Sequence, residues 1–204
     1  MALVKLNNRG VRSATTFGSI SALGEMRFIK KLTASSSATL SFVDGTSDVV
    51  LDDTYKEYVF TFKDIHGSAE GSLTFNLSVD SGSNYNVTKT TTHFLAEHGE
   101  DDSFNSLGYR TGDDLAQATG FKTIHRSTEF NADESACGYL HIFNPSSTTF
   151  VKHFMARTSS AGAARSHDSY IAGYGNTTSA VDAVQFKMDS GNIDAGDICL
   201  YGIN

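Results

Sequence analysis

The stretch Ser72–Asp80, with sequence SLTFNLSVD, decides the fold class of this chain. Its apolar residues Leu73, Phe75, Leu77 and Val79 occupy every second position, and polar residues stand between them. Strict alternation over nine residues is typical of a β-strand that packs one face against a core. A Ser- and Gly-rich turn follows directly, so the strand is expected to end there.

Strand-like stretches continue on both sides of Ser72–Asp80, separated by Gly, Ser, Asn and Asp turns. Pro145, the only proline, lies between two of these stretches and indicates a hairpin over residues 136–157. Alternation of strands with helices is missing, which argues against a parallel sheet. We expect an all-β, antiparallel, jelly-roll-like β-sandwich. The further predicted strands cover residues 26–33, 38–43, 48–51, 57–63, 86–96, 120–126, 136–143, 148–157, 169–175, 183–188 and 197–203.

The chain divides into an arm and one domain in this interpretation. Residues 1–25 are rich in small and polar residues and are predicted to be an N-terminal arm or linker that mediates assembly. Residues 26–204 are predicted to form a single domain, the alternative being two small sandwiches divided near residue 105. One long loop, Gly99–Gly120, is expected to contain a short helix at Asp113–Thr119. Ser159–Arg165 is expected to be a loop of small residues.

Composition excludes several classes of protein. The 204 residues include 46 Ser and Thr, 18 Gly, one Pro and no Trp, which suits strands and turns better than long helices. The formal net charge of -7 argues against a nucleic-acid-binding protein that neutralises phosphates. Apolar runs are too short for a membrane-spanning helix, and the first six residues lack the apolar core of a secretory signal. We therefore expect no nucleic-acid partner and no membrane insertion.

Catalytic motifs are missing from the sequence. There is no G-x-S-x-G elbow, and Gly173-Tyr-Gly175 lacks the other glycines and the helix of a phosphate-binding loop. Cys137 and Cys199 are interpreted as two reduced, buried thiols, although a bridge between them stays open. His141 and His153 lie on the two arms of the predicted hairpin and are either strand histidines or a pair of metal ligands. We expect a protein that is not an enzyme and holds no cofactor and no metal.

An acidic cluster and nearby tyrosines are the candidate ligand or interface residues. Acidic side chains gather before the long loop, and a solvated loop is the simplest interpretation, with divalent-cation binding or glycoside hydrolysis as alternatives. Tyrosines near loops can stack on sugars or anchor a protein interface. The candidate loop residues are Glu97, Glu100, Asp101, Asp102 and Tyr109, and the other loop tyrosines are Tyr55, Tyr85 and Tyr174.

Four segments carry a resemblance to a known family. They are Ala2–Arg12 (ALVKLNNRGVR), Asp52–Tyr58 (DDTYKEY), Thr148–Met155 (TTFVKHFM) and Gln185–Ile203 (QFKMDSGNIDAGDICLYGI). The sequence resembles small virion structural proteins of marine tailed bacteriophages, including cyanophages. In such proteins a turn like Ser190–Ile193 and a final Leu-Tyr-Gly strand close a jelly roll.

The resemblance implies a structural role in the virion and supplies no catalytic residues. The expected place is the tail, as a short fibre, adaptor or receptor-binding module acting as a symmetric oligomer, most simply a homotrimer. The alternatives are a capsid decoration or head fibre protein and a carbohydrate-binding or glycan-active protein. The expected partners are other copies of the chain, other virion proteins and a host surface glycan. The residues of the arm that we expect to mediate assembly are Leu3, Val4, Leu6, Arg9 and Arg12.

Overall fold

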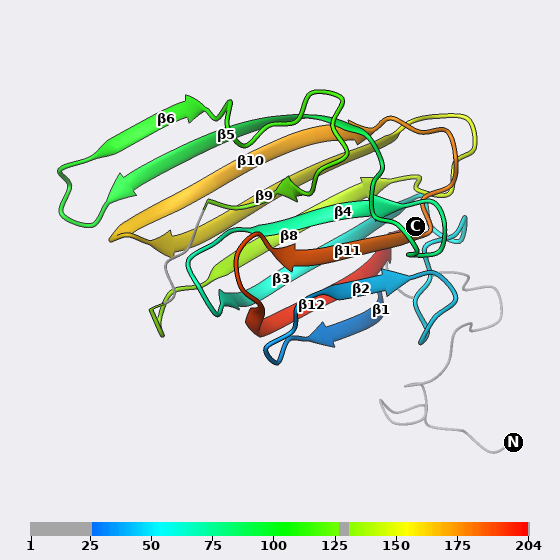
Figure 1. Ribbon diagram of the computed structural model, residues 1–204, viewed down its shortest axis with the longest axis horizontal. Helices are drawn as coiled ribbons and strands as arrows, with labels where there is room; N and C mark the ends of the chain where they lie inside the picture. Colours follow the sequence, from blue (N-terminus) through cyan, green and yellow to red (C-terminus); the bar gives the residue numbers. More distant parts are fainter. Residues whose placement is uncertain (1–25, 127–130, 204) are drawn as a thin grey trace, which may run out of the picture.

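The structure is a computed structural model that describes residues 26–126 and 131–203, and all its regular secondary structure is β (Figure 1). The predicted assembly arm, residues 1–25, lies outside the described residues. No described helix could span a membrane. The strands are β1 (Met26–Thr33), β2 (Leu40–Val43), β3 (Glu57–Gly67), β4 (Leu73–Ser78), β5 (Lys89–Gly99), β6 (Asn105–Tyr109), β7 (Lys122–Thr123), β8 (Ala136–Phe143), β9 (Lys152–Gly162), β10 (Arg165–Gly175), β11 (Ala183–Met188) and β12 (Ile193–Ile203).

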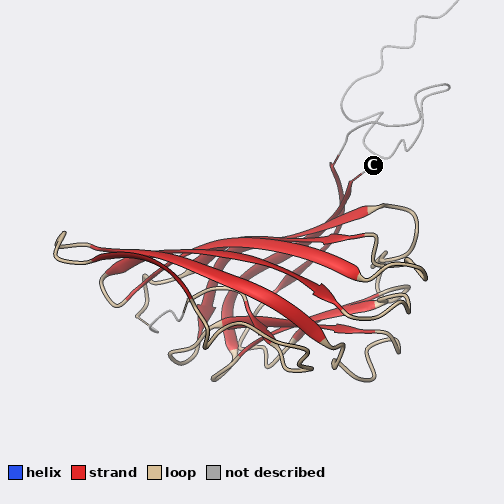
Figure 2. Cartoon of the chain, turned by 90° about the horizontal axis from the view of Figure 1, so that it is seen from above, coloured by secondary structure: helices blue, strands red, loops and turns tan. Residues whose placement is uncertain are grey.

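These strands form two antiparallel sheets, consistent with a β-sandwich. The large sheet has eight strands in the order β1-β12-β3-β8-β9-β10-β5-β6, and the small sheet has four in the order β2-β11-β4-β7. Figure 2 shows the long strands of the large sheet in profile, with the connecting loops at both ends. The all-β prediction is confirmed, and so is the hairpin predicted over residues 136–157, since β8 and β9 pair antiparallel.

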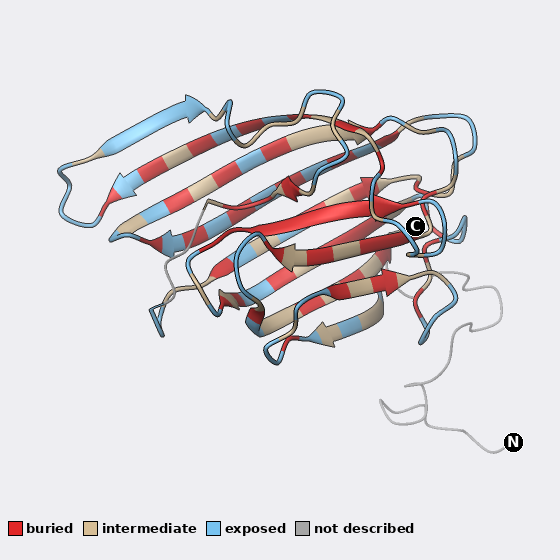
Figure 3. Cartoon of the chain, viewed as in Figure 1, coloured by how far each residue is buried: buried red, intermediate tan, exposed pale blue. Residues whose placement is uncertain are grey.

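The core lies between the two sheets and is dominated by phenylalanine. Phe42 and Phe186 of the small sheet pack against Phe60 of the large sheet, with ring centres 5.2 Å from Phe60 in each case. All three side chains are fully buried. Burial of large apolar side chains is the main stabilising contribution to folding, about 1.5–3 kcal/mol for each. Figure 3 shows the resulting alternation of buried and exposed positions along the strands.

The alternation in β4 is confirmed for Leu73, Phe75 and Leu77, which are all buried in the core. Val79, predicted on the same face, lies beyond the end of β4 and is 38% exposed. The polar residues between them are also buried, which the sequence did not predict. Asn76 explains why this is tolerated, since its side-chain amide donates to the carbonyls of Tyr85 and Thr119. The segments after β4 therefore cover the face that the sequence assigned to solvent.

The predicted helix at Asp113–Thr119 is wrong. These residues form turns whose backbone is bonded to β5: the Thr91 N–H donates to the Leu115 carbonyl, and Lys89 and Ala118 exchange both of their backbone hydrogen bonds. Backbone groups used in this way cannot make the bonds of a helical turn. The loop predicted over Gly99–Gly120 also contains a strand, β6, which pairs with β5.

Three further predictions need correction. The expected strand at residues 48–51 is a loop, and the expected strand at 120–126 is reduced to the two residues of β7. Ser159–Arg165, predicted to be a loop of small residues, is a tight hairpin, because β9 continues to Gly162 and β10 starts at Arg165. Ala163 and Ala164 both have φ near +54°, as in the two-residue turns that suit the twist of paired strands.

Candidate functional site

The candidate functional site is the outer face of the large sheet, which we define as the face that points away from the small sheet. On β9 every second residue, from His153 to Ala161, is exposed, and the intervening residues are buried. The small sheet and the segment after β6 cover the opposite face, where the Thr158 hydroxyl bonds to the Ile124 carbonyl. The outer face is therefore open to solvent in the described part of the chain.

Strand register places one row of large side chains across the outer face. Directly paired positions on β8, β9, β10, β5 and β6 carry three tyrosines, one arginine and one phenylalanine. Neighbouring strands lie about 4.8 Å apart, so directly paired residues present neighbouring side chains on the same face. We name this set the aromatic row: Tyr139, Arg157, Tyr170, Phe94 and Tyr109. Its four aromatic side chains are 40–46% exposed.

Arg157 lies between Tyr139 and Tyr170 in the aromatic row and is held by two residues of the neighbouring strand β10. Its guanidinium donates two hydrogen bonds to Asp168, Nε to Oδ1 at 3.1 Å and Nη2 to Oδ2 at 2.8 Å. The same guanidinium lies 4.6 Å from the ring centre of Tyr170. The hydrogen bonds to Arg157 hold the pKa of the Asp168 carboxyl below its usual range. The two charges thus neutralise each other within an aromatic surface.

The far end of the aromatic row is fixed by Tyr109. Its ring meets Phe94 edge-on, with ring centres 5.2 Å apart. Its hydroxyl donates to Asp114 Oδ2 at 2.7 Å, and this hydrogen bond raises the pKa of Tyr109. Aromatic pairs of this geometry contribute about 0.5–1.5 kcal/mol beyond the area that they bury. The predicted candidate residue Tyr109 therefore belongs to the outer face.

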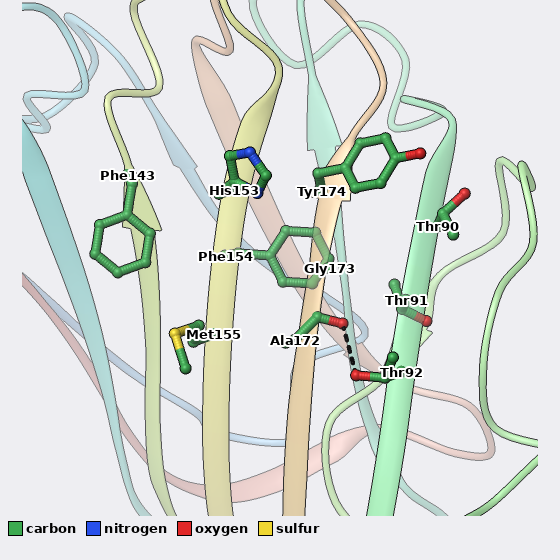
Figure 4. A pocket seen from close by; sticks show the side chains of 10 residues that line it. All are labelled: Thr90, Thr91, Thr92, Phe143, His153, Phe154, Met155, Ala172, Gly173 and Tyr174. Carbon is green, nitrogen blue, oxygen red and sulfur yellow. Dashed lines mark hydrogen bonds between the residues drawn. The ribbon is translucent and has the colours of Figure 1, made fainter.

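A shallow hollow of about 480 Å³ lies beside the aromatic row (Figure 4). It is formed where β5 and β9 begin and where β8 and β10 end. His153 and Tyr174 stand on neighbouring strands with ring centres 6.0 Å apart, and Met155 is 55% exposed. Gly173 allows the buried Phe154 ring to lie beneath the hollow, because a Cβ at position 173 would come within 2.8 Å of that ring. The lining is Thr90, Thr91, Thr92, Phe143, His153, Phe154, Met155, Ala172, Gly173 and Tyr174.

The predicted acidic cluster is not one site. Glu97 lies in β5 and points inward, where its carboxylate lies 3.6 Å from Arg165 and 3.5 Å from His167. Glu100, Asp101 and Asp102 are exposed in the turn between β5 and β6. Hydrogen bonds from Ser103 lower the pKa of Asp101. Within the ranges that the structure covers, no three His, Cys, Asp or Glu side chains are arranged to hold a metal ion.

The cysteine and histidine predictions are confirmed only in part. Cys137 and Cys199 are both free, but neither is buried: Cys137 is exposed and Cys199 is half-buried. His141 and His153 both lie on the outer face and have different partners. The His141 ring bonds to Glu57, and the His153 ring packs beside Tyr174. The arrangement is that of strand histidines.

A buried polar layer beneath β5 and β10 was missed by the sequence analysis. Lys89, Lys122 and Lys152 are fully buried, and so are His93 and His125. Burial lowers the pKa of Lys89 and Lys122 to about 8 and that of the two histidines to about 4. The sequence indicated this layer only through β5, where polar residues alternate between the two faces of the strand. The inward-facing positions, which are usually apolar in a core strand, are among those that carry polar residues.

Comparison of the chain with protein-family models, with curated proteins and with solved structures gave no match. The outer face is therefore interpreted from its own chemistry. It offers exposed aromatic rings, one neutralised ion pair and a shallow apolar hollow, which together suit binding to another surface.

Proposed function

We propose that the protein is a non-enzymatic structural protein of a bacteriophage virion that assembles as a homo-oligomer, most simply a homotrimer, through the outer face of its large sheet. The tail is the proposed place, where the oligomer serves as a short fibre, an adaptor or a receptor-binding module. Support comes from the resemblance of four sequence segments to small virion proteins and from the chemistry of the outer face.

The observation that carries the proposal is the aromatic row. Tyrosine, phenylalanine, methionine and arginine are the residues enriched in the centres of protein interfaces, and unpaired charges are depleted there. Tyr170 and Phe94 are 42% and 46% exposed, and Met155 lies one row away at 55%. A contiguous surface of this kind on a protein marks an interaction site. A second copy would remove it from water.

Strand order supports the jelly-roll part of the proposal. A jelly roll is a double sheet of eight strands built from two Greek keys. When the β9–β10 hairpin, the edge strand β1 and its neighbour β12 are set aside, the large sheet runs β3-β8-β5-β6 and the small sheet β2-β11-β4-β7. This is the order in which a rolled pair of Greek keys distributes its strands between two sheets. We therefore infer a jelly roll widened by one inserted hairpin and two added strands.

Location on the particle tests the proposed function. An antibody against the purified protein, used to label intact particles, is expected to mark one end of the particle, with a copy number of a few multiples of three. Label over the whole head, with hundreds of copies, would replace the tail assignment by capsid decoration. Absence of the protein from purified particles would contradict a structural role in the virion.

The hollow beside the aromatic row supports a second candidate function, which is binding of a host surface glycan. Tyr174 and His153 present rings to it, and the Thr90 hydroxyl is held by the Gln117 side chain at 2.6 Å. Ring faces beside hydroxyl groups suit a sugar, which has both apolar and hydrogen-bonding faces. A glycan array is expected to show binding that Tyr174→Ala abolishes and Phe150→Ala retains. An array without any bound glycan would contradict this candidate.

A further inference from the structure

The open edge of β6 is the feature that carries the inference. β6 ends the large sheet, and its only strand partner in the described structure is β5. All five residues, Asn105–Tyr109, are exposed, and Leu107 is 76% exposed. The stretch contains no charge and no proline. Natural proteins usually protect long exposed edges with such residues, so an unprotected edge indicates a place where another strand adds.

The register shows which backbone groups of β6 are available. The Gly99 N–H donates to the Phe104 carbonyl, and the Arg110 N–H donates to the His93 carbonyl. In an antiparallel pair such hydrogen-bonded positions alternate with positions whose groups point away from the partner. Ser106 and Gly108 therefore bond to β5, whereas the N–H and carbonyl groups of Asn105, Leu107 and Tyr109 point to the open edge.

The opposite edge of the same sheet is protected. β1 contains Arg27, Lys30 and Lys31, and its register with β12 shifts between Phe28 and Lys30. Lysines and irregular register are the usual devices that prevent a strand from adding to an edge. The two edges of the large sheet thus differ, and β6 is the one suited to accept a strand.

Charge favours an occupant from this chain. Carboxylates flank β6 in the sequence. Glu100, Asp101 and Asp102 precede it, and Asp113 and Asp114 follow it. The charge of Asp113 is partly balanced by Arg110, whose Nε lies 3.6 Å from Asp113 Oδ2. Residues 1–25 contain three basic residues and one acidic residue, hence a net charge of +2 in a chain whose total is -7. The segment ALVKL at residues 2–6 also supplies the apolar side chains that a strand beside Leu107 needs.

Topology favours the arm of a neighbouring copy over the arm of the same copy. Residues 1–25 lie outside the described residues and join the sheet at Met26 in β1, the edge opposite β6. Crossing from one edge to the other within one copy means spanning seven strand spacings, about 34 Å. That path would use most of the roughly 43 Å that residues 13–25 span when fully extended, whereas a neighbour whose β6 edge lies beside β1 needs only a short connection.

We infer that residues 2–12 of one copy add as a strand to the β6 edge of the next copy. The contact is heterologous, because the arm of each copy meets a different surface on its neighbour, and such contacts close into rings such as a trimer. The inference rests on the proposed self-association and supplies its route. It assigns one purpose to the arm residues Leu3, Val4, Lys5 and Leu6 and to the strand Asn105–Tyr109.

Cysteine cross-linking between two differently tagged, co-expressed copies of the full chain tests the inference. Both copies carry Cys137→Ser and Cys199→Ser, one adds Val4→Cys and the other adds Leu107→Cys. Under mild oxidation we expect a disulfide-linked pair that contains both tags. The matched control replaces Leu107→Cys with Lys30→Cys on the β1 edge and is expected to give at least tenfold less product.

The outcomes separate the inference from the proposed function. Equal cross-linking at Lys30→Cys, or linkage of two Leu107→Cys copies to each other, would overturn the arm route. An oligomer that forms without any arm cross-link would also overturn it while leaving self-association intact. A chain that stays monomeric would contradict the proposed function itself.

A proline on β6 gives a second test that does not depend on cysteines. Leu107→Pro removes an N–H that points to the open edge and leaves the β5 bonds of Ser106 and Gly108 in place. We expect the variant to fold with an unchanged melting temperature, within a few degrees, and to lose oligomer by about tenfold or more in dissociation constant. Leu107→Ile is the matched control. A Leu107→Pro variant that folds and assembles normally would overturn the inference.

Discussion

Arg157 on β9 holds its guanidinium 4.6 Å from the ring centre of Tyr170, its direct partner on β10, and at the same time forms two hydrogen bonds to Asp168. Exposed ion pairs contribute little to folding stability, about 0–1 kcal/mol. The effect of this arrangement is to hold the Arg157 guanidinium against the Tyr170 ring and to balance its charge with that of Asp168. The middle of the outer face is thereby ready for burial against another protein surface.

Tyr170→Ser tests the outer face as the site of self-association. A buried tyrosine at an interface centre contributes about 2 kcal/mol or more, so the dissociation constant of the oligomer should rise about thirtyfold. Sedimentation velocity over a concentration series measures it. Phe150→Ser is the matched control, since Phe150 is 68% exposed but lies in the loop before β9. Equal weakening by both substitutions would contradict a specific role of the outer face.

Acid should destabilise the fold through His93 and His125. Burial lowers the pKa of both rings to about 4, below the usual value near 6.5. Between pH 6.5 and 4 the unfolded chain binds more protons than the folded one, so the free energy of unfolding falls as pH falls through this range. The expected loss is on the order of 2 kcal/mol for each histidine.

His125 explains this sensitivity structurally. Its Nε2 accepts the Leu73 N–H at 2.8 Å, and its Nδ1 donates to the Arg126 carbonyl. Protonation of Nε2 would make it a donor that faces the Leu73 N–H, so two N–H groups would oppose each other in the core. Urea unfolding at pH 7, 5.5 and 4.5 measures the effect, with exposed His98→Asn as a control that should retain it. Stability that is constant from pH 7 to 4.5 would show that the two rings are not buried as neutral groups.

Lys122 should make stability rise at alkaline pH. Burial lowers its pKa to about 8 from a usual value near 10.5. Between these values the folded protein loses the proton first, so the free energy of unfolding increases with pH, by about 2 kcal/mol in all. Lys122→Met should show a smaller increase than the unaltered chain, because it loses the contribution of Lys122 and keeps that of Lys89, whose pKa burial also lowers to about 8. Exposed Lys63→Met should keep the whole increase. Chemical unfolding at pH 7.5 and 10 compares the three proteins, and parallel profiles would refute the prediction.

Gly173→Ala should destabilise the sheet beneath the hollow. A Cβ at this position would lie 2.7 Å from the Thr90 carbonyl oxygen and 2.8 Å from both Phe154 and Thr91. Relieving such contacts requires backbone movement, and we expect a loss of about 2 kcal/mol in the free energy of unfolding. Gly112→Ala is the control, because nothing lies within 4 Å of its Cβ. Thermal unfolding measures both, and equal melting temperatures would contradict the close packing.

The sequence predicted those parts of the fold that depend on local alternation. The Leu73, Phe75 and Leu77 positions of β4 and the β8–β9 hairpin follow from neighbours in the chain. The Asp113–Thr119 helix failed because the backbone of that segment bonds to Lys89 and Thr91, residues about 25 positions earlier. Local propensity contains no information about such a partner.

The candidate site was only partly predictable for the same reason. The sequence indicated Tyr109 and Tyr174 only individually, as tyrosines near loops. The aromatic row depends on the register of five strands, and a shift of one residue in any strand would turn its side chain to the other face. Glu97 is an example. It lies in an acidic stretch of the sequence, but the alternation of side chains along β5 directs it inward, toward Arg165 and His167.

The mass of the full chain in solution tests the central claim most directly. Sedimentation equilibrium at concentrations from about 1 to 100 µM, typical for protein association, should give three times the 21.9 kDa of one copy. A mass of one copy across the whole range would contradict assembly through the outer face and, with it, the proposed role as a symmetric virion protein.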